Sequence, residues 1–221
     1  MIQGRRFGRV SALLLPFAFC LLPSLLSGCA VVGVVAHALP PANILPKYSG
    51  LAGQSVGVMV WADRGIRIDY PTIQVDLATS LQNKLKNLDI EDLEGTTWPV
   101  DPRSIVRYQQ DHPEIQAMSV TDVAPKLGVL RLIYIEIEQF ATRSEASLDL
   151  YRGSITATIK VIEIANGTAT VAFEENNVQV VFPPKVPQEG IPSGNDYRMY
   201  MGTVDEFTSA AALRFITHPE D

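Results

Sequence analysis

Apolar and polar residues alternate along three stretches in the second half of the chain, residues 129–143, 151–165 and 168–182. Alternation with a period of two is typical of β-strands that are buried on one side. Asn166-Gly167 stands between the last two stretches and favours a type I′ turn, which needs positive φ at both central positions. The pattern therefore predicts a three-strand antiparallel meander.

The first half of the domain predicts one strand and several helices. QSVGVMVWA, residues 54–62, is a short apolar run rich in β-branched residues, as in a buried strand. Shorter helices are predicted at residues 102–110 and 119–128, the second ended by Gly128. A longer amphipathic helix is predicted after Pro71, where an apolar stripe has helical spacing: Ile73, Leu77, Leu81, Leu85 and Leu88.

The end of the chain predicts a loop followed by one more helix. Residues 183–197 hold four prolines and two glycines, which indicates a long connection. The helix is predicted at residues 200–218, with four candidate core positions: Val204, Phe207, Ala211 and Phe215. In order, these elements predict an α+β fold. We expect an antiparallel or mixed sheet with a three-strand meander, packed on one side by two to four helices.

The N-terminal region has the pattern of a secretory signal. Residues 1–9 carry three arginines, and no further charge occurs before Lys47. The intervening apolar run reaches two small residues, Ser27 and Gly28, just before Cys29. LLSGC resembles the bacterial lipobox. That resemblance implies cleavage before Cys29, attachment of acyl chains such as palmitate to Cys29, and anchoring in a membrane.

Two alternatives to lipidation stay open. The uncharged run is long enough for an uncleaved transmembrane anchor, although Pro16, Pro23, Gly28 and Gly33 interrupt it. Plain secretion after cleavage is the other. We expect a signal peptide at 1–28, a lipidated apolar and then proline-rich tether at 29–52, and one α+β domain at 53–221. Ala30, rather than aspartate, follows the cysteine, which by resemblance to Gram-negative lipoproteins points to the outer membrane, facing the periplasm.

Composition limits the remaining function classes. With 221 residues, 47% of them hydrophobic, the chain can form one domain with a substantial core. The net charge is −6, and without a basic stripe we expect no nucleic-acid partner. The two cysteines, Cys20 and Cys29, lie in or beside the signal, which excludes a cysteine zinc site in the domain. The histidines stand singly in the sequence, so we expect no metal and no cofactor.

Four segments carry a resemblance for the domain: SVGVMVWADRG, the stripe at 73–88, VAPKLGVLRLIYIEIEQF, and the hairpin ATIKVIEIANGTATVAF. Their order resembles the small α+β domain of envelope lipoproteins related to the curli-secretion lipoprotein, the penicillin-binding-protein activator lipoproteins and the N-terminal domain of the Tol-system propeller protein. The resemblance implies an accessory role in envelope assembly, secretion or transport. It brings no catalytic or ligand-binding residues.

Two places favour contact with another envelope protein. Trp61 and Arg64 follow the first predicted strand, and both residue types are common interface anchors. Tyr197, Met199 and Tyr200 follow the proline-rich loop, where exposed Tyr and Met would suit protein contacts. The alternative for each group is ordinary packing within the domain.

No catalytic motif accompanies these features, and we expect a non-enzymatic binding protein. Glu136, Glu138 and Glu163 would be the carboxylates of a hydrolase, but they also fit a solvated sheet face paired with Lys160 or Arg131. A small-ligand or glycan-binding lipoprotein is the second hypothesis. It predicts a concave apolar pocket between the helices and the sheet.

Overall fold

The structure is a computed structural model that describes residues 43–185 and 187–220. The chain divides into two units, and residues 44–218 form the larger one. The expected signal peptide, Cys29 and most of the expected tether lie outside the described residues. Two very short strands, β1 (Asn43–Ile44) and β6 (His218–Pro219), stand near the ends of the described chain.

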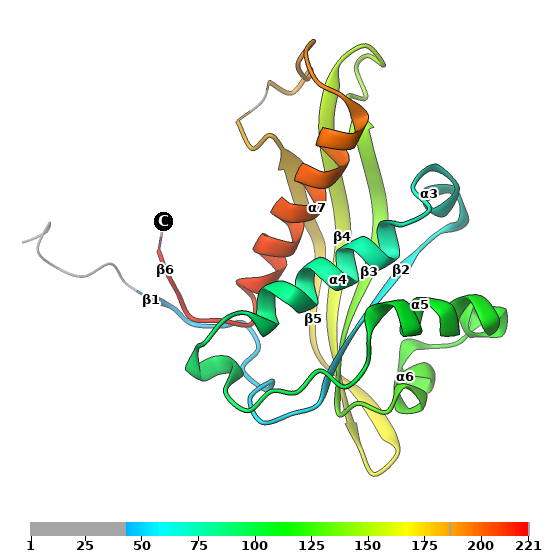
Figure 1. Ribbon diagram of the computed structural model, residues 1–221, viewed down its shortest axis with the longest axis vertical. Coiled ribbons are helices and arrows are strands. Elements are labelled where there is room, and N and C mark those ends of the chain that lie inside the picture. Colours follow the sequence, from blue (N-terminus) through cyan, green and yellow to red (C-terminus); the bar gives the residue numbers. More distant parts are fainter. Residues whose placement is uncertain (1–42, 186, 221) are drawn as a thin grey trace, which may run out of the picture. The chain divides into compact units, whose positions relative to one another are not determined.

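A four-stranded mixed sheet forms the centre of the unit (Figure 1). Its strands lie in the order β2 (Val56–Ala62), β3 (Arg131–Arg143), β4 (Tyr151–Ala165) and β5 (Thr168–Phe182). β2 runs parallel to β3, whereas β3, β4 and β5 form an antiparallel meander. The α+β class and the meander predicted from the sequence are confirmed.

Local sequence explains the turn of the longest hairpin. Asn166 and Gly167 join β4 to β5 with φ angles of 52° and 76°, the left-handed values that a type I′ turn requires. Ala165 pairs with Thr168 directly across this turn. The Asn-Gly pair therefore sets the register next to the turn, and two irregularities farther along, at Val161/Ile162 and Ala157/Ile159, shift it.

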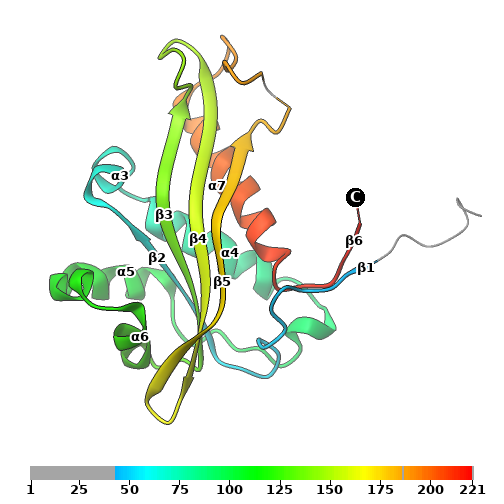
Figure 2. The same cartoon turned by 180° about the vertical axis from the view of Figure 1, so that it is seen from behind.

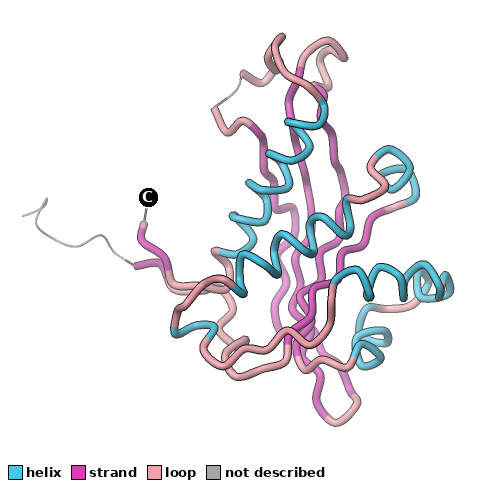
Figure 3. Tube along the Cα trace, in the orientation of Figure 1, coloured by secondary structure: helices cyan, strands magenta, loops and turns pink. Residues whose placement is uncertain are grey.

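Two helices cover what we call the first face of the sheet, the side that carries Val58, Ile135 and Ile159. These are α4 (Ile73–Lys86) and α7 (Asp196–Ala212), which lie against the same side of the strands (Figures 1 and 3). All four core positions predicted for the last helix are buried, and they belong to this cluster: Val204, Phe207, Ala211 and Phe215. The first face thus holds the larger core of the domain.

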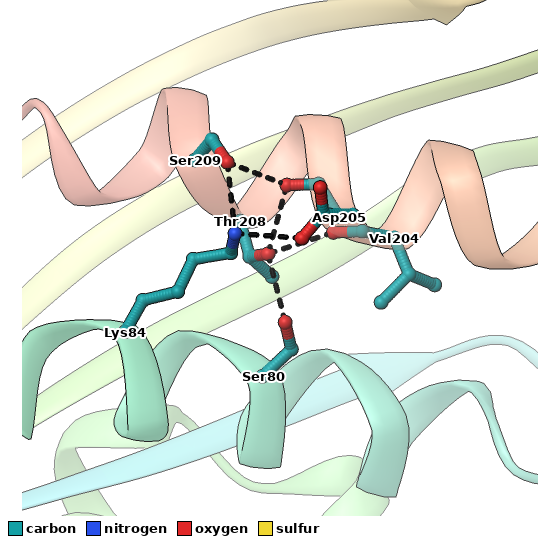
Figure 4. A network of polar contacts seen from close by, with 6 residues as sticks. All are labelled: Ser80, Lys84, Val204, Asp205, Thr208 and Ser209. Carbon is teal, nitrogen blue, oxygen red and sulfur yellow. Dashed lines mark hydrogen bonds and ion pairs between the residues drawn. The ribbon is translucent and has the colours of Figure 1, made fainter. Parts of the chain in front are cut away.

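Polar contacts join α4 to α7 above this core (Figure 4). Lys84 Nζ donates to Asp205 Oδ1 at 2.7 Å and to Ser209 Oγ at 2.9 Å. One turn away, the hydroxyls of Ser80 and Thr208 are 3.0 Å apart, and Thr208 also donates to the Val204 carbonyl oxygen. Because the buried hydroxyl of Thr208 is satisfied, it adds an inter-helix contact without a desolvation penalty.

Short elements cover part of the opposite side, the second face, which carries Met59, Leu132 and Tyr134 (Figure 2). They are α5 (Pro102–Asp111), the 3-10 helix η2 (Pro113–Ala117), α6 (Val120–Val123) and the 3-10 helix η3 (Ala124–Leu127). The sequence predicted helices on one side only. In the structure, helical elements lie on both sides of the sheet. The residues of β2 and β3 are apolar on both sides, and those on the second face form a second, smaller core.

Three local features differ from the sequence prediction. A short helix, α3 (Arg64–Asp69), follows β2 and begins where Asp63 Oδ1 accepts a hydrogen bond from the Ile66 amide. The 3-10 helix η1 (Glu91–Leu93) follows α4, in a stretch for which no element was predicted. The core also takes in Tyr48 and Leu51, which fall within the range 29–52 expected as a tether.

Candidate functional site

A cavity of about 450 Å³ opens on the second face of the sheet. Side chains of β2 and β3 form one side of it: Met59, Trp61, Tyr134 and Glu136. Residues of α5, η2 and α6 contribute the opposite side, among them Gln109, Ile115 and Val123. A cavity of this size, lined by aromatic and aliphatic groups with a few polar ones, is typical of small-molecule sites.

Gln109 is the most unusual residue in the cavity wall. It is 8% exposed, and its Nε2 donates to the Val60 carbonyl oxygen at 3.1 Å. Because a carbonyl oxygen can only accept, the amide group must turn its nitrogen toward Val60, and Oε1 is left as the second polar atom of the side chain. Oε1 is buried and has no hydrogen-bond partner among the described residues. A buried acceptor without a donor costs about 1–3 kcal/mol, so the fold carries a penalty here.

A second glutamine fixes the same carbonyl. Gln74 of α4 is also 8% exposed and lines the cavity, and its Nε2 donates to Val60 O at 2.8 Å. β2 is the edge strand of the sheet, so side chains rather than another strand lie beside it. The two amides therefore act together in seating α4 and α5 against this edge.

Charged groups of both signs border the cavity. Arg67 Nε donates to the Asp63 carbonyl oxygen at 3.3 Å, and Lys160 Nζ lies 3.1 Å from Glu174 Oε1. Glu136 is half-buried beside them. Burial, and then the neighbouring Glu136 charge, raise the pKa of Tyr134 far above its usual value of 10.0. The Tyr134 hydroxyl is thus protonated at any physiological pH.

The structure separates the two residues singled out after the first strand. Trp61 is half-buried and lines the cavity. Arg64 is exposed at the start of α3 and does not line the cavity, where Arg67 lies instead. Arg64 and Arg67 are three residues apart, so they lie on the same side of α3 but about one helical turn apart along its axis. Only Arg67 is at the position that borders the cavity.

The three residues singled out near α7 have different surroundings. Tyr197 is 75% exposed. Met199 is buried, so the prediction that it offers a partner contact is corrected, because α7 turns this side chain into the core. The Tyr200 hydroxyl donates to Asp76 Oδ2 at 2.5 Å, and its ring stacks on Tyr70. Burial and the Asp76 hydrogen bond raise the pKa of Tyr200.

The candidate carboxylates of a hydrolase have separate partners. Glu138 accepts a hydrogen bond from Thr158 at 2.6 Å. Glu163 accepts one from Tyr48 at 2.8 Å and lies 3.6 Å from Arg131 Nε, as the solvated-face alternative anticipated for Arg131. Burial and the Glu163 hydrogen bond raise the pKa of Tyr48 to about 12. Of the three glutamates, Glu136 alone lines the cavity.

Residues 43–185 and 187–220 contain no group of three or more His, Cys, Asp and Glu side chains arranged to hold a metal ion. None of their helices has the length and apolar character needed to cross a membrane.

Sequence reasoning missed Gln109 and Gln74, although a signal was present. Gln109 follows Ile105 and Val106 at helical spacing, on the side of α5 that is buried. A polar residue on the apolar side of a short helix either has a buried partner or faces a site. In α5, Gln109 has the buried partner Val60 O for its Nε2, and the residue also lines the cavity.

Comparisons with known proteins give only distant similarities. No family model matches the chain, and no curated protein matches its sequence. The PelC dodecamer from Paraburkholderia phytofirmans aligns with 79% of this chain and 96% of its own, at 8% identity and a TM-score of 0.40. Lipoprotein GNA1162 from Neisseria meningitidis aligns with 71% and 94%, at 12% identity and 0.40. The hypothetical protein CT253 from Chlamydia trachomatis aligns with 57% and 71%, at 12% and 0.36. At these TM-scores the similarity carries no argument about function.

Proposed function

We propose that this chain is a lipoprotein of a bacterial cell envelope, anchored through Cys29, that acts by binding another envelope protein rather than by catalysis. The observation that carries the proposal is LLSGC at residues 25–29, placed after an arginine-bearing start and an uncharged apolar run. The outer membrane, with the domain facing the periplasm, is the expected location. An accessory role in envelope assembly, secretion or transport follows from the resemblance of the domain.

One end of the sheet offers a contact surface for such a partner. We call Leu148 and Tyr197 the apolar tip, because they are 80% and 75% exposed. Arg143 connects them: Nη1 donates to the Leu148 carbonyl oxygen at 2.9 Å, and Nη2 donates to Asp196 Oδ2 at 2.6 Å. The turn between β3 and β4 and the start of α7 lie at the same end of the sheet in both views (Figures 1 and 2).

The Arg143 guanidinium is held in place from two sides. It lies 3.9 Å from the centroid of the Tyr151 ring and forms two hydrogen bonds to the Asp196 carboxylate. The Arg143 hydrogen bonds first, and then the hydrogen bond from Thr142, hold the pKa of Asp196 below its usual 3.8. The apolar tip is therefore presented on a pre-ordered frame, which lowers the entropic cost of binding.

Anchoring is tested with Cys29→Ser in the producing bacterium, and Cys20→Ser is the matched control within the expected signal peptide. We expect Cys29→Ser to leave the membrane fraction, because the thiol is the acylation site, and Cys20→Ser to remain there. Intact mass of the extracted wild-type chain should show loss of residues 1–28 and addition of acyl groups. An unprocessed mass, or membrane retention of Cys29→Ser, would refute the proposal.

The contact surface is tested by cross-linking in intact cells, followed by identification of the captured protein. Tyr197→Ala and Leu148→Ala should each reduce capture of a specific envelope partner. Ile68→Ala is the control, since Ile68 is 65% exposed on α3, away from the apolar tip. Equal capture by the wild type and both tip variants would rule out the apolar tip as the contact.

A further inference from the structure

We propose that the cavity on the second face binds a neutral, polyhydroxylated ligand of the size of a mono- or disaccharide. The inference rests on the cavity alone and is independent of how the chain is anchored or which partner it contacts. Its volume of about 450 Å³ lies in the range of small-molecule sites.

The apolar part of the cavity suits the C–H face of a sugar ring. Trp61 and Tyr134 come from neighbouring strands and lie on the same side of the sheet, since Trp61 pairs with Glu136 and Met59 pairs with Tyr134 in the parallel register. Aromatic side chains supply a large, rigid apolar surface at low entropic cost. Met118 lines the cavity opposite them and, with its flexible side chain, can adjust to the ligand.

The polar part of the cavity mixes acceptors with donors. Gln109 Oε1 and the Glu136 carboxylate accept hydrogen bonds, whereas Arg67 and Lys160 donate them. An ammonium ligand only donates and would meet two cations. A carboxylate ligand only accepts and would meet Glu136 and the Gln109 acceptor, and a phosphate would bring one to two negative charges next to Glu136. A hydroxyl group both donates and accepts, so a ligand with several hydroxyls fits all four groups.

Gln109 adds a further reason to expect a ligand, because it lines the cavity. Its Oε1 is buried and without a partner among the described residues, while Nε2 is fixed by Val60. The amide cannot rotate to satisfy Oε1 without losing the bond to Val60. Because Oε1 is buried, a ligand hydroxyl reaches it only if the side chains around it shift, and that hydrogen bond would then remove the penalty of the unpaired acceptor.

Tryptophan fluorescence gives a direct measurement. The chain has two tryptophans, and Trp98 lies with Leu85 and Leu93 away from the cavity, so Trp98→Phe leaves Trp61 as the single reporter. The full-length Trp98→Phe chain in detergent is titrated with glucose, N-acetylglucosamine, cellobiose and chitobiose. Spermidine and inorganic phosphate are the ammonium and anion probes. We expect saturable quenching or enhancement by at least one saccharide, at micromolar to millimolar concentration.

Three variants in this background, two at assigned contacts and one control, test the assignment. Gln109→Leu should weaken saccharide binding about tenfold, the effect of losing one buried hydrogen bond. Gln82→Leu is the matched control, because Gln82 Oε1 is also buried without a partner but Gln82 does not line the cavity. It should bind like the parent. Glu136→Ala, at a half-buried position, gives an independent test of the polar side and should also weaken binding.

Several outcomes would overturn the proposal. They are the absence of saturable binding by any of the four saccharides, binding of spermidine or phosphate instead, and equal loss of binding in Gln109→Leu and Gln82→Leu. Failure here leaves the anchoring experiment unaffected, since Cys29→Ser reports on location and these titrations report on the cavity.

Discussion

The two faces of the sheet differ in how completely they are covered. On the first face, α4 and α7 pack along the strands, and fully buried side chains such as Phe207, Phe215 and Ile159 fill the space between. On the second face, α5, η2, α6 and η3 are short, and they leave a cavity next to Trp61 and Tyr134. Both faces use the same strands, so the difference comes from the helices.

This difference separates stability from binding within one small domain. Burial of closely packed apolar side chains is the main favourable contribution to folding, and the larger cluster of such side chains lies on the first face. The second face retains a cavity, which reduces its contribution to stability. An unpaired buried acceptor occurs near both faces, Gln109 Oε1 on α5 and Gln82 Oε1 on α4, but of these two residues only Gln109 lines the cavity. Sites that bind ligands commonly break the rules of packing in this way.

The largest expected effect compares two isoleucines truncated on opposite faces. Ile159→Ala, at a fully buried position of central strand β4, should lower the free energy of unfolding by about 4 kcal/mol. Ile115→Ala, in the wall of the existing cavity, should cost about 2 kcal/mol, because its neighbours have room to relax. Urea denaturation measures both. Equal losses would mean that the two faces are packed alike.

Two glycines give the next comparison, with an expected difference of about 1–3 kcal/mol. A Cβ at Gly153 of β4 would overlap Thr203 Oγ1 on α7 and lie 3.1 Å from the Met199 carbonyl oxygen. A Cβ at Gly57 of β2 would meet Val129 at an ordinary 3.4 Å. In thermal unfolding, Gly153→Ala should therefore destabilise the domain, whereas Gly57→Ala should be nearly neutral. The reverse order would contradict the close approach of α7 to β4.

Neutralising the Glu175 carboxylate, which Arg214 contacts just after α7, should have a smaller effect. We expect the free energy of unfolding to fall by about 1 kcal/mol or less at neutral pH. Burial alone would raise the pKa of Glu175, but hydrogen bonds from Lys47 and Arg214 hold it below its usual 4.5. A lowered pKa means that ionised Glu175 stabilises the fold above pH 4.5 and that this contribution is lost as the pH falls through the lower, folded-state value. Glu175→Gln should flatten the acid side of the stability profile.

Glu114, on η2, is the control for that profile. Its pKa is also lowered, first by a backbone hydrogen bond and then by His112, but the carboxylate is exposed to solvent. Water and salt screen such contacts, so Glu114→Gln should leave the acid dependence of unfolding unchanged. If the two substitutions flattened the dependence of unfolding free energy on pH equally, the contacts of Lys47 and Arg214 with partly buried Glu175 would contribute no more than the exposed contacts of Glu114.

Local patterns in the sequence were sufficient to predict the first face. The stripe at 73–88 predicted α4, the alternation predicted three long strands, and Asn166-Gly167 predicted their tightest turn. Met199 could also have been placed correctly. It lies four residues before Thr203 and eight before Phe207, the spacing of one buried helix side.

The second face was harder to predict because its pattern is not local. α3 has no buried residue, so its only sequence signal is the Asp63 cap. Gln109 acquires its meaning from Val60, a residue distant in the chain that only the fold brings within 3.1 Å. The sequence singled out Trp61, but as a contact for a partner protein and not as a cavity residue, and the buried amides required the tertiary arrangement.

The smallest expected effect concerns these amides, and it distinguishes a binding role for Gln109 from a structural one. Gln109→Leu should change the free energy of unfolding by no more than about 0.5 kcal/mol, because it removes an unpaired acceptor and Gln74 still donates to Val60 O. Gln74→Leu should be similar, since Gln109 then remains. The double variant leaves the carbonyl without either amide and should cost about 1–3 kcal/mol more than the two single changes together. Additive costs would show that each amide stabilises the edge independently. A large loss from Gln109→Leu alone would make this residue a structural support, and its unpaired Oε1 would then be a tolerated defect of the second face.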